Sequence, residues 1–269
     1  MKNKTLSIIF FSFLSITSVH AITVDEIMSG YYENTGGKEA WKKLSGMKML
    51  GEMNQGGMKF PFEIVSLKDG RQYFKFSFQG KELKQNVFDG ETMWSTNFMT
   101  MKAEKADAEA TANQKLEMND FPSPLFDYKQ KGYELKYIGT EEKDGAETYK
   151  LQLTREQKTV DGQKVDDVSY YYFEVDSLVP LVTESEMKEG PMKGKIAESK
   201  LGDYQEVEGL YIPFSLTQGV KDGPGVSMTV STIELNPTVD ESEFMMPKVE
   251  VKETVKEEPK KEAVAEKIQ

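Results

Sequence analysis

Strict alternation of apolar and polar residues is the feature of this sequence that most limits its fold. It occurs in four stretches, residues 57–66, 72–80, 148–154 and 209–217. In the second stretch, Phe74, Phe76 and Phe78 are separated by single polar residues. A period of two places every second side chain on the same face of an extended strand. The sequence therefore predicts antiparallel strands with one apolar and one polar face.

Turn signals that contain glycine separate these strands. They are Gln55-Gly56-Gly57, Asp69-Gly70, Asp89-Gly90, Asp144-Gly145, Asp161-Gly162 and Asp222-Gly223. Asp-Gly between two alternating runs favours a tight β-hairpin, because both residues tolerate a positive φ. We therefore expect Asp89 and Gly90 to be structural turn residues that present Trp94, and a catalytic role for Asp89 is the weaker interpretation.

The apolar rows of the predicted strands are rich in phenylalanine and methionine. They form either an ordinary packed core or the lining of a cavity that accepts an apolar ligand. Composition alone favours the core, although methionine is typical of surfaces that accept varied apolar partners. The candidate ligand-binding residues are Met58, Phe60, Phe62, Ile64, Phe74, Phe76, Phe78, Trp94, Phe98, Met99, Leu210, Ile212 and Phe214.

Helical signals precede and interrupt the strand pattern. Thr23 and Glu26 have the spacing of a capping box, which predicts the start of a helix. Gly36-Gly37 breaks the apolar pattern that follows, so we expect two short helices within residues 23–44. Residues 101–120 are rich in Ala, Lys and Glu and poor in large apolar side chains. This composition predicts an exposed helix that packs weakly.

The two ends of the chain differ from the part between them. Residues 1–21 combine Lys2 and Lys4 with an apolar run, which predicts a signal peptide cleaved after Ala21. Residues 248–269 contain six Lys, six Glu and no aromatic residue, so we expect a charged, disordered tail. A helix that binds a partner is the alternative there. Residues 22–247 are expected to form one domain.

Missing residue types exclude several function classes. The chain has no Cys, and its one His, His20, lies in the predicted signal peptide. A mature chain without His or Cys has no Ser-His-Asp or Cys-His triad, no thiolate chemistry and no zinc site built on His. The excess of 45 acidic over 34 basic residues makes nucleic acid and anionic membrane surfaces poor partners.

Groups of neighbouring carboxylates are the remaining candidates for acid–base chemistry. Each group lies beside a predicted turn or on the polar face of a predicted strand, so solvated surface is the preferred interpretation. A carboxylate-based hydrolase stays a minor alternative. The groups are Asp166-Asp167, Glu184 with Glu186, Asp203 with Glu206 and Glu208, and Asp240 with Glu241 and Glu243.

Several stretches, in their order along the chain, resemble the LolA-like outer-membrane lipoprotein-sorting proteins of the LolA/LolB superfamily. "VFDGETMWSTN" (87–97) is similar to the Asp-Gly-x-x-x-Trp hairpin of that family. "GGKEAWKKLSGMKML" (36–50) resembles its passage from helix to first strand. "YIGTEEKDGAETYKLQLT", "GDYQEVEGLYIPFSL" and "IELNPTVDESEFMMP" resemble its later hairpins and its close. The resemblance covers most of residues 23–247.

This resemblance implies a mainly β fold with helices (α+β), a strongly curved antiparallel half-barrel with a helical lid enclosing an apolar cavity. It also implies that a basic residue, Arg in the family, ends the strand before the Phe-rich one and holds the lid. The matching position here is Lys68, which is therefore the expected lid tether. Lysine keeps the charge of arginine but lacks its planar fork of donors.

Together, the residues and the resemblance predict a non-catalytic carrier in the periplasm of a Gram-negative bacterium. We expect it to bind the acyl chains of lipoproteins or other lipids, as a monomer, and to need no cofactor and no metal. An inner-membrane donor and an outer-membrane acceptor protein are the expected protein partners. The alternatives are a lipid-sensing or scaffold protein that acts through a partner protein, and the carboxylate-based hydrolase.

Overall fold

The computed structural model describes residues 22–247, so the predicted signal peptide and the predicted tail lie outside the described residues. The described residues divide into two compact units. The first unit comprises residues 22–43, 127–157 and 164–229, and the second comprises residues 44–126, 158–163 and 230–247. That residues 22–247 form one domain stays a prediction.

Strands dominate both units. The hydrogen-bonded order of the main sheet is β6-β5-β4-β3-β2-β1-β15-β14-β13-β12-β11-β8-β7, and β9 and β10 form a separate hairpin. Since this order begins at β6 and ends at β7, the sheet is open. An open antiparallel sheet with a few short helices confirms the predicted mainly β class.

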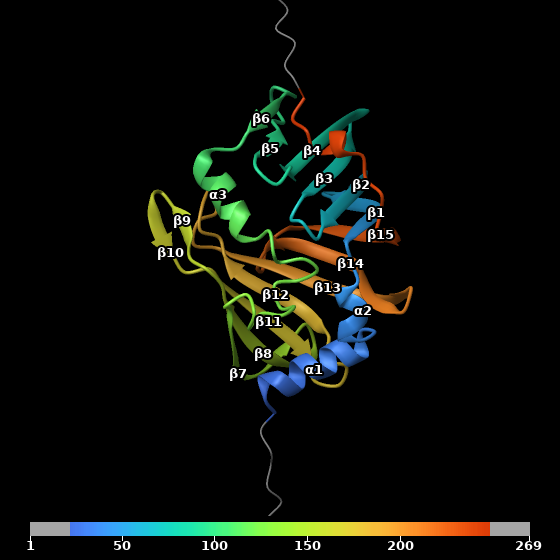
Figure 1. The fold of residues 1–269 in the computed structure, drawn as a ribbon, viewed down its shortest axis with the longest axis vertical. Helices are drawn as coiled ribbons and strands as arrows, with labels where there is room; N and C mark the ends of the chain where they lie inside the picture. The colour runs from blue at the N-terminus through green and yellow to red at the C-terminus, as the bar shows by residue number, and fades with distance from the viewer. Residues whose placement is uncertain (1–21, 248–269) are drawn as a thin grey trace, which may run out of the picture. The chain divides into compact units, whose positions relative to one another are not determined.

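The first unit combines two N-terminal helices with the second half of the sheet. Its elements are α1 (Val24–Asn34), α2 (Lys38–Lys42), β7 (Glu134–Lys143), β8 (Ala146–Thr154), β11 (Val168–Glu174), β12 (Pro180–Glu186), β13 (Ile196–Val207) and β14 (Leu210–Val220). Thr23 and Glu26 form the predicted capping box of α1. Helix α1 lies beside β7 (Figure 1). Its Tyr31 ring meets the Phe173 ring edge to face, with centroids 5.6 Å apart.

The second unit holds the first half of the sheet. Its elements are β1 (Gly46–Gln55), β2 (Met58–Leu67), β3 (Gln72–Phe78), β4 (Lys81–Phe88), β5 (Met93–Thr96), β6 (Ala103–Lys105), α3 (Ala108–Leu116), β9 (Lys158–Val160) and η1 (Glu241–Glu243). Strand β15 (Gly225–Leu235) and strand β10 (Gln163–Val165) each contribute residues to both units.

Every predicted glycine-containing turn joins two consecutive strands, which confirms these predictions. At the turn between β7 and β8, for example, Asp144 has φ 53° and Gly145 has φ 81°. Two successive positive φ angles are characteristic of the hairpin turns whose twist matches that of the strands. The meander of hairpins is therefore set by local backbone preference.

The central helix is shorter than predicted. Helix α3 spans Ala108–Leu116, whereas part of the predicted helical stretch forms the edge strand β6. Asp107 ends the strand region and caps the helix, because its carboxylate accepts the amide hydrogen of Ala110 at 2.7 Å. As expected from its composition, α3 has no buried residue. It is held to the β9 hairpin by paired hydrogen bonds between Asn113 and Thr159.

Candidate functional site

Phenylalanine rings line one face of β2 and β3. Antiparallel pairing places Phe62 opposite Phe76, and Ile64 opposite Phe74. Residues that lie directly opposite each other point to the same face of a sheet. The same register extends this apolar face, here called the Phe face, to β1 and β4. Its members are Met53, Phe60, Phe62, Ile64, Phe74, Phe76, Phe78 and Leu83.

The rings of Phe62, Phe74 and Phe76 contact one another in a row, and those of Phe60 and Phe78 form a separate pair on the same face. Ring centroids lie 5.6 Å apart for Phe60 and Phe78, and 5.4 Å apart for Phe74 and Phe76. Phe98, from the loop after β5, extends the row because its ring lies 6.1 Å from that of Phe76. Phe76 is buried, whereas Phe60, Phe74 and Phe78 keep part of their surface exposed. The sequence thus brings most of its predicted ligand-binding phenylalanines together.

A hollow of about 390 Å³ lies at the end of this row. Phe98 belongs both to the row and to the hollow. The other lining residues are mostly polar, so the hollow has an apolar side and a polar rim. They are Gln85, Ser95, Thr96, Asn97, Met99, Glu104, Lys105 and Ala106.

Trp94 lies on the opposite face of the strands from the Phe face. Strand β4 has one extra residue at Asn86, whose φ is 51°, so Tyr73 of β3 faces both Asn86 and Val87 of β4. Such a bulge reverses the faces of the residues beyond it. Trp94, which pairs with Val87, therefore packs with Val65 and Tyr73 instead of the phenylalanines. This corrects the expectation that Trp94 and the phenylalanines line one wall.

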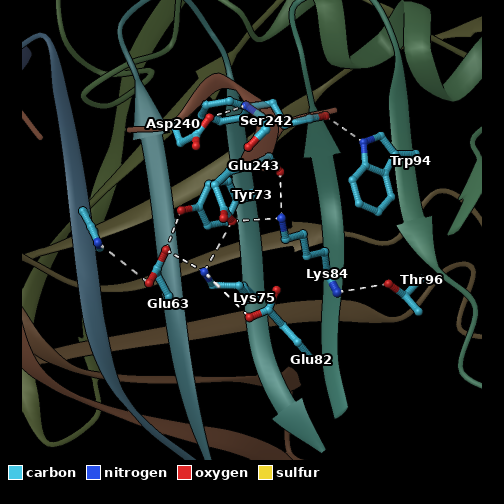
Figure 2. Close-up of polar contacts among 12 residues, drawn as sticks. Glu63, Tyr73, Lys75, Glu82, Lys84, Trp94, Thr96, Asp240, Ser242 and Glu243 are labelled. Atoms are coloured by element: carbon cyan, nitrogen blue, oxygen red, sulfur yellow. Dashed lines mark hydrogen bonds and ion pairs between the residues drawn. The ribbon is translucent and has the colours of Figure 1, made fainter. Parts of the chain in front are cut away.

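On that opposite face, lysine and glutamate side chains form a network around Tyr73, as Figure 2 shows. The Tyr73 hydroxyl donates to Glu63, and the Lys75 ammonium lies 3.1 Å from the Glu63 carboxylate. The Glu243 carboxylate accepts from Lys84 at 2.9 Å and from Lys75 at 3.4 Å. Strands β2, β3 and β4 and a segment near the end of the described chain therefore share one set of charges.

The pKa values in this network move in the directions that these contacts require. Burial alone would raise the pKa of Glu63, but the donors Tyr73 and Lys75 outweigh it and lower that pKa. The Lys84 ammonium lowers the pKa of Glu243. Burial and the neighbouring Glu63 raise the pKa of Tyr73. The carboxylates are therefore ionised and the tyrosine is neutral at neutral pH, which favours a structural network over proton transfer.

Residues 239–246, here called the clasp, close over this network. Phe244 is 2% exposed, and its ring lies 5.4 Å from that of Tyr73. The Trp94 indole Nε1–H donates to the Phe244 carbonyl at 2.9 Å, and Lys84 donates to the Glu243 carbonyl at 3.0 Å (Figure 2). The clasp is therefore held by the buried Phe244 ring, by the Glu243 carboxylate and by the backbone carbonyls of both residues.

Sequence reasoning missed Arg71, which also holds the clasp. Its guanidinium lies 5.2 Å from the centre of the Phe244 ring, 2.8 Å from the Asp69 carboxylate and 3.7 Å from that of Glu241. The predicted lid tether, Lys68, lies in the same turn with an exposed side chain. A lid-holding role for Lys68 stays a prediction.

The remaining predicted ligand-binding residues fall into two groups. Met58, Phe98 and Met99 lie in the second unit and are 58%, 60% and 94% exposed. Leu210, Ile212 and Phe214 are buried on β14 in the first unit. Leu210 packs under the turn between α1 and α2, because a Cβ on Gly36 would lie 3.0 Å from its side chain.

Asp89 and Gly90 form the turn between β4 and β5. The Asp89 carboxylate accepts the amide hydrogens of Glu91 at 2.8 Å and Thr92 at 2.7 Å, and Gly90 has φ 99°. The carboxylate is therefore used to fix the backbone, as expected from the Asp-Gly signal.

Glu184 and Glu243 are not solvated surface carboxylates, which corrects that part of the sequence interpretation. Glu184 is 7% exposed and accepts from Lys143, from Lys221 at 3.0 Å and from the Tyr172 hydroxyl at 2.8 Å. Burial raises its pKa, but these donors outweigh burial and lower the pKa to about 2. A carboxyl group with this pKa is no general acid at neutral pH.

Two features that residues 22–247 lack bear on other functions. No group of three or more His, Cys, Asp or Glu side chains is arranged there to hold a metal ion. No helix in this part of the chain has the length and apolar character needed to cross a membrane.

Comparison with known proteins places this geometry in a known fold. No family model and no curated protein matches the sequence. A solved LolA superfamily protein from Nitrosomonas europaea matches the structure with a TM-score of 0.50 and 12% identity, over 84% of this chain and 98% of that chain. The chain has the LolA-like fold.

Two further solved structures are similar to this chain. A proposed outer-membrane lipoprotein-sorting domain from Vibrio parahaemolyticus has a TM-score of 0.49 and 11% identity, over 81% of this chain and 94% of its own. A DUF1329 family protein from Desulfovibrio piger has a TM-score of 0.48 and 14% identity, over 81% and 97%. The match to the Nitrosomonas europaea protein confirms the predicted resemblance to LolA-like proteins at the level of the fold.

Proposed function

We propose that this protein is a non-catalytic carrier that binds an acyl chain or another long apolar group along its Phe face. The observation that carries the proposal is the row of rings from Phe62 to Phe98, with the Phe60–Phe78 pair on the same face. Half-buried rings of this set lie beside a polar-rimmed hollow. A half-buried ring in such a row can bury more surface against a ligand. The LolA-like fold supports the proposal, because the similar sorting domain is assigned to outer-membrane lipoproteins.

Apolar area alone supplies enough free energy for this function. A chain of about 15 methylenes offers on the order of 12 kcal/mol, at about 0.8 kcal/mol for each, before ordering costs. Tight binding therefore needs no catalytic residue and no charged contact. The polar hollow would receive the head of the ligand while its chain lies along the rings.

The cellular setting belongs to the same proposal. Export to the periplasm is supported by the signal-peptide pattern in residues 1–21, which lies outside the described residues. Lipoproteins or other lipids are the proposed cargo, passed between a membrane donor and a membrane acceptor. The LolA-like fold and the absence of His and Cys from residues 22–269 support a carrier over a hydrolase.

Titration with a fluorescent fatty acid tests the proposal. Phe74→Asp places a charge on the Phe face at a half-buried position, so it should abolish probe binding while circular dichroism stays unchanged. Ser77→Asp is the matched control, because Ser77 lies on β3 on the other face, opposite Glu82. Equal probe affinity in both variants and the wild type would contradict binding along the Phe face.

A further inference from the structure

The clasp and the Phe face share the same strands. Along β3, Tyr73 and Lys75 point to the clasp, whereas Phe74 and Phe76 point to the Phe face. Successive side chains of a strand lie on opposite faces, so the position of each pair fixes that of the other. On β4, Lys84 contacts the clasp, and its neighbour Leu83 belongs to the Phe face.

Strands β5 and β6 pair with their neighbours over short ladders, to which hydrogen bonds from β4 to Thr96 and Ser95 add. Strand β5 has four residues and β6 has three, and β6 is the first strand in the sheet order. The register between β4 and β5 contains two residue pairs, one of which is Val87 with Trp94. Short edge strands contribute few ladder hydrogen bonds, and regions with few buried contacts open locally at low cost.

The clasp makes additional contacts with three strands. The Phe244 backbone carbonyl binds Trp94 on β5, and Glu243 binds Lys84 on β4 and Lys75 on β3. The Phe244 ring joins the buried cluster of Val65, Tyr73, Val87 and Trp94. Neighbouring Met245, in contrast, is 61% exposed. Glu243 and Phe244 therefore make the contacts that reach β3, β4 and β5, while Val239 and Met246 pack against the same cluster.

We infer that the clasp controls how firmly the Phe face holds its ligand. With the clasp docked, β3, β4 and β5 stay paired and the rings keep the spacing that encloses an apolar chain. With the clasp released, β5 and its loop separate first, so Phe98 and the hollow leave the row and the ligand dissociates. This inference rests on the proposed function, whose site it regulates.

Release kinetics in the full chain test the coupling. Phe244→Ala removes the anchor, and Met245→Ala is the matched control at the adjacent exposed position. We expect a fluorescent fatty acid to leave Phe244→Ala faster by about 5- to 150-fold, the range of ordinary coupling between sites, and Met245→Ala at the wild-type rate. Glu243→Gln, which keeps the shape of the side chain, should also speed release.

Hydrogen exchange of the same variants separates the two proposals. Faster exchange in residues 239–246 reports release of the clasp, and faster exchange in β3–β5 reports its effect on the strands. Release of the clasp with unchanged probe dissociation would overturn the inference. If the wild type binds no probe, the proposed function fails, and the coupling is judged by exchange in β3–β5 alone. Unchanged exchange there in Glu243→Gln and Phe244→Ala would overturn it.

Discussion

The two faces of β2, β3 and β4 use the same backbone in different ways. The Phe face is apolar, and its row of rings from Phe62 to Phe76 is extended by Phe98, which is 60% exposed. The other face carries Glu63, Lys75 and Lys84, and the clasp of the same unit covers it. These strands can offer the apolar Phe face to a ligand because ion pairs and the clasp stabilise their opposite face.

Loss of the anchor should produce the largest effect on the clasp side. Phe244 is 2% exposed, so Phe244→Ala should lower the free energy of unfolding of the second unit by about 3–5 kcal/mol. Met245→Ala should change it by less than about 0.5 kcal/mol. Urea denaturation of both variants measures this difference. Equal midpoints would show that the clasp does not stabilise the strands.

Acid should weaken the charged networks and leave the apolar row unaffected. The pKa of Glu184 is lowered to about 2, so its stabilising contribution is complete above the unfolded pKa of about 4.3 and is lost as pH falls toward 2. That loss is at most about 3 kcal/mol. The lowered pKa values of Glu63 and Glu243 act in the same direction.

Unfolding measured between pH 6 and pH 2 checks this linkage. The wild type should lose stability steadily below about pH 4.3, and Glu184→Gln should be less stable at pH 6 but depend less on pH in this range. Identical pH profiles for the two proteins would refute the assigned ion pairs.

A single hydrogen bond should have an intermediate effect. Trp94→Phe keeps most of the ring but removes the Nε1–H that binds the Phe244 carbonyl, so it should cost about 1–3 kcal/mol. Trp41→Phe is the control, since it removes an equivalent hydrogen bond to the Thr35 carbonyl in the first unit. Hydrogen exchange in residues 239–246 should rise in the first variant alone. A rise in both would contradict a local role for Trp94.

A substitution in the turn that joins β4 to β5 should have the smallest effect, and it should affect the Phe face and the clasp equally. Asp89→Ala removes a carboxylate that accepts two amide hydrogens, at a cost of about 1 kcal/mol. Probe affinity and clasp exchange should change together and only slightly. Thermal unfolding measures the loss, and Asp89→Asn should restore most of it. A large loss of probe binding in Asp89→Ala with the fold intact would indicate a direct role in the site.

Local signals explain which parts of the fold could be predicted. The strands, the hairpin turns and the capping box at Thr23 depend on residues close together in sequence. The bulge at Asn86 was missed, since no alternation break marks it, and it moved Trp94 to the other face. The clasp was missed because Phe244 meets Trp94 across 150 positions. The sequence predicted that its carboxylates are solvated, because the contacts of Glu243 with Lys75 and Lys84 form only in the folded chain.

Native mass spectrometry of the protein purified without detergent tests the central claim most directly. Binding along the Phe face predicts a species heavier than the chain by the mass of an acylated ligand, which Phe74→Asp lacks and Ser77→Asp retains. A chain mass alone, unchanged after incubation with lipids, would contradict ligand binding along the Phe face.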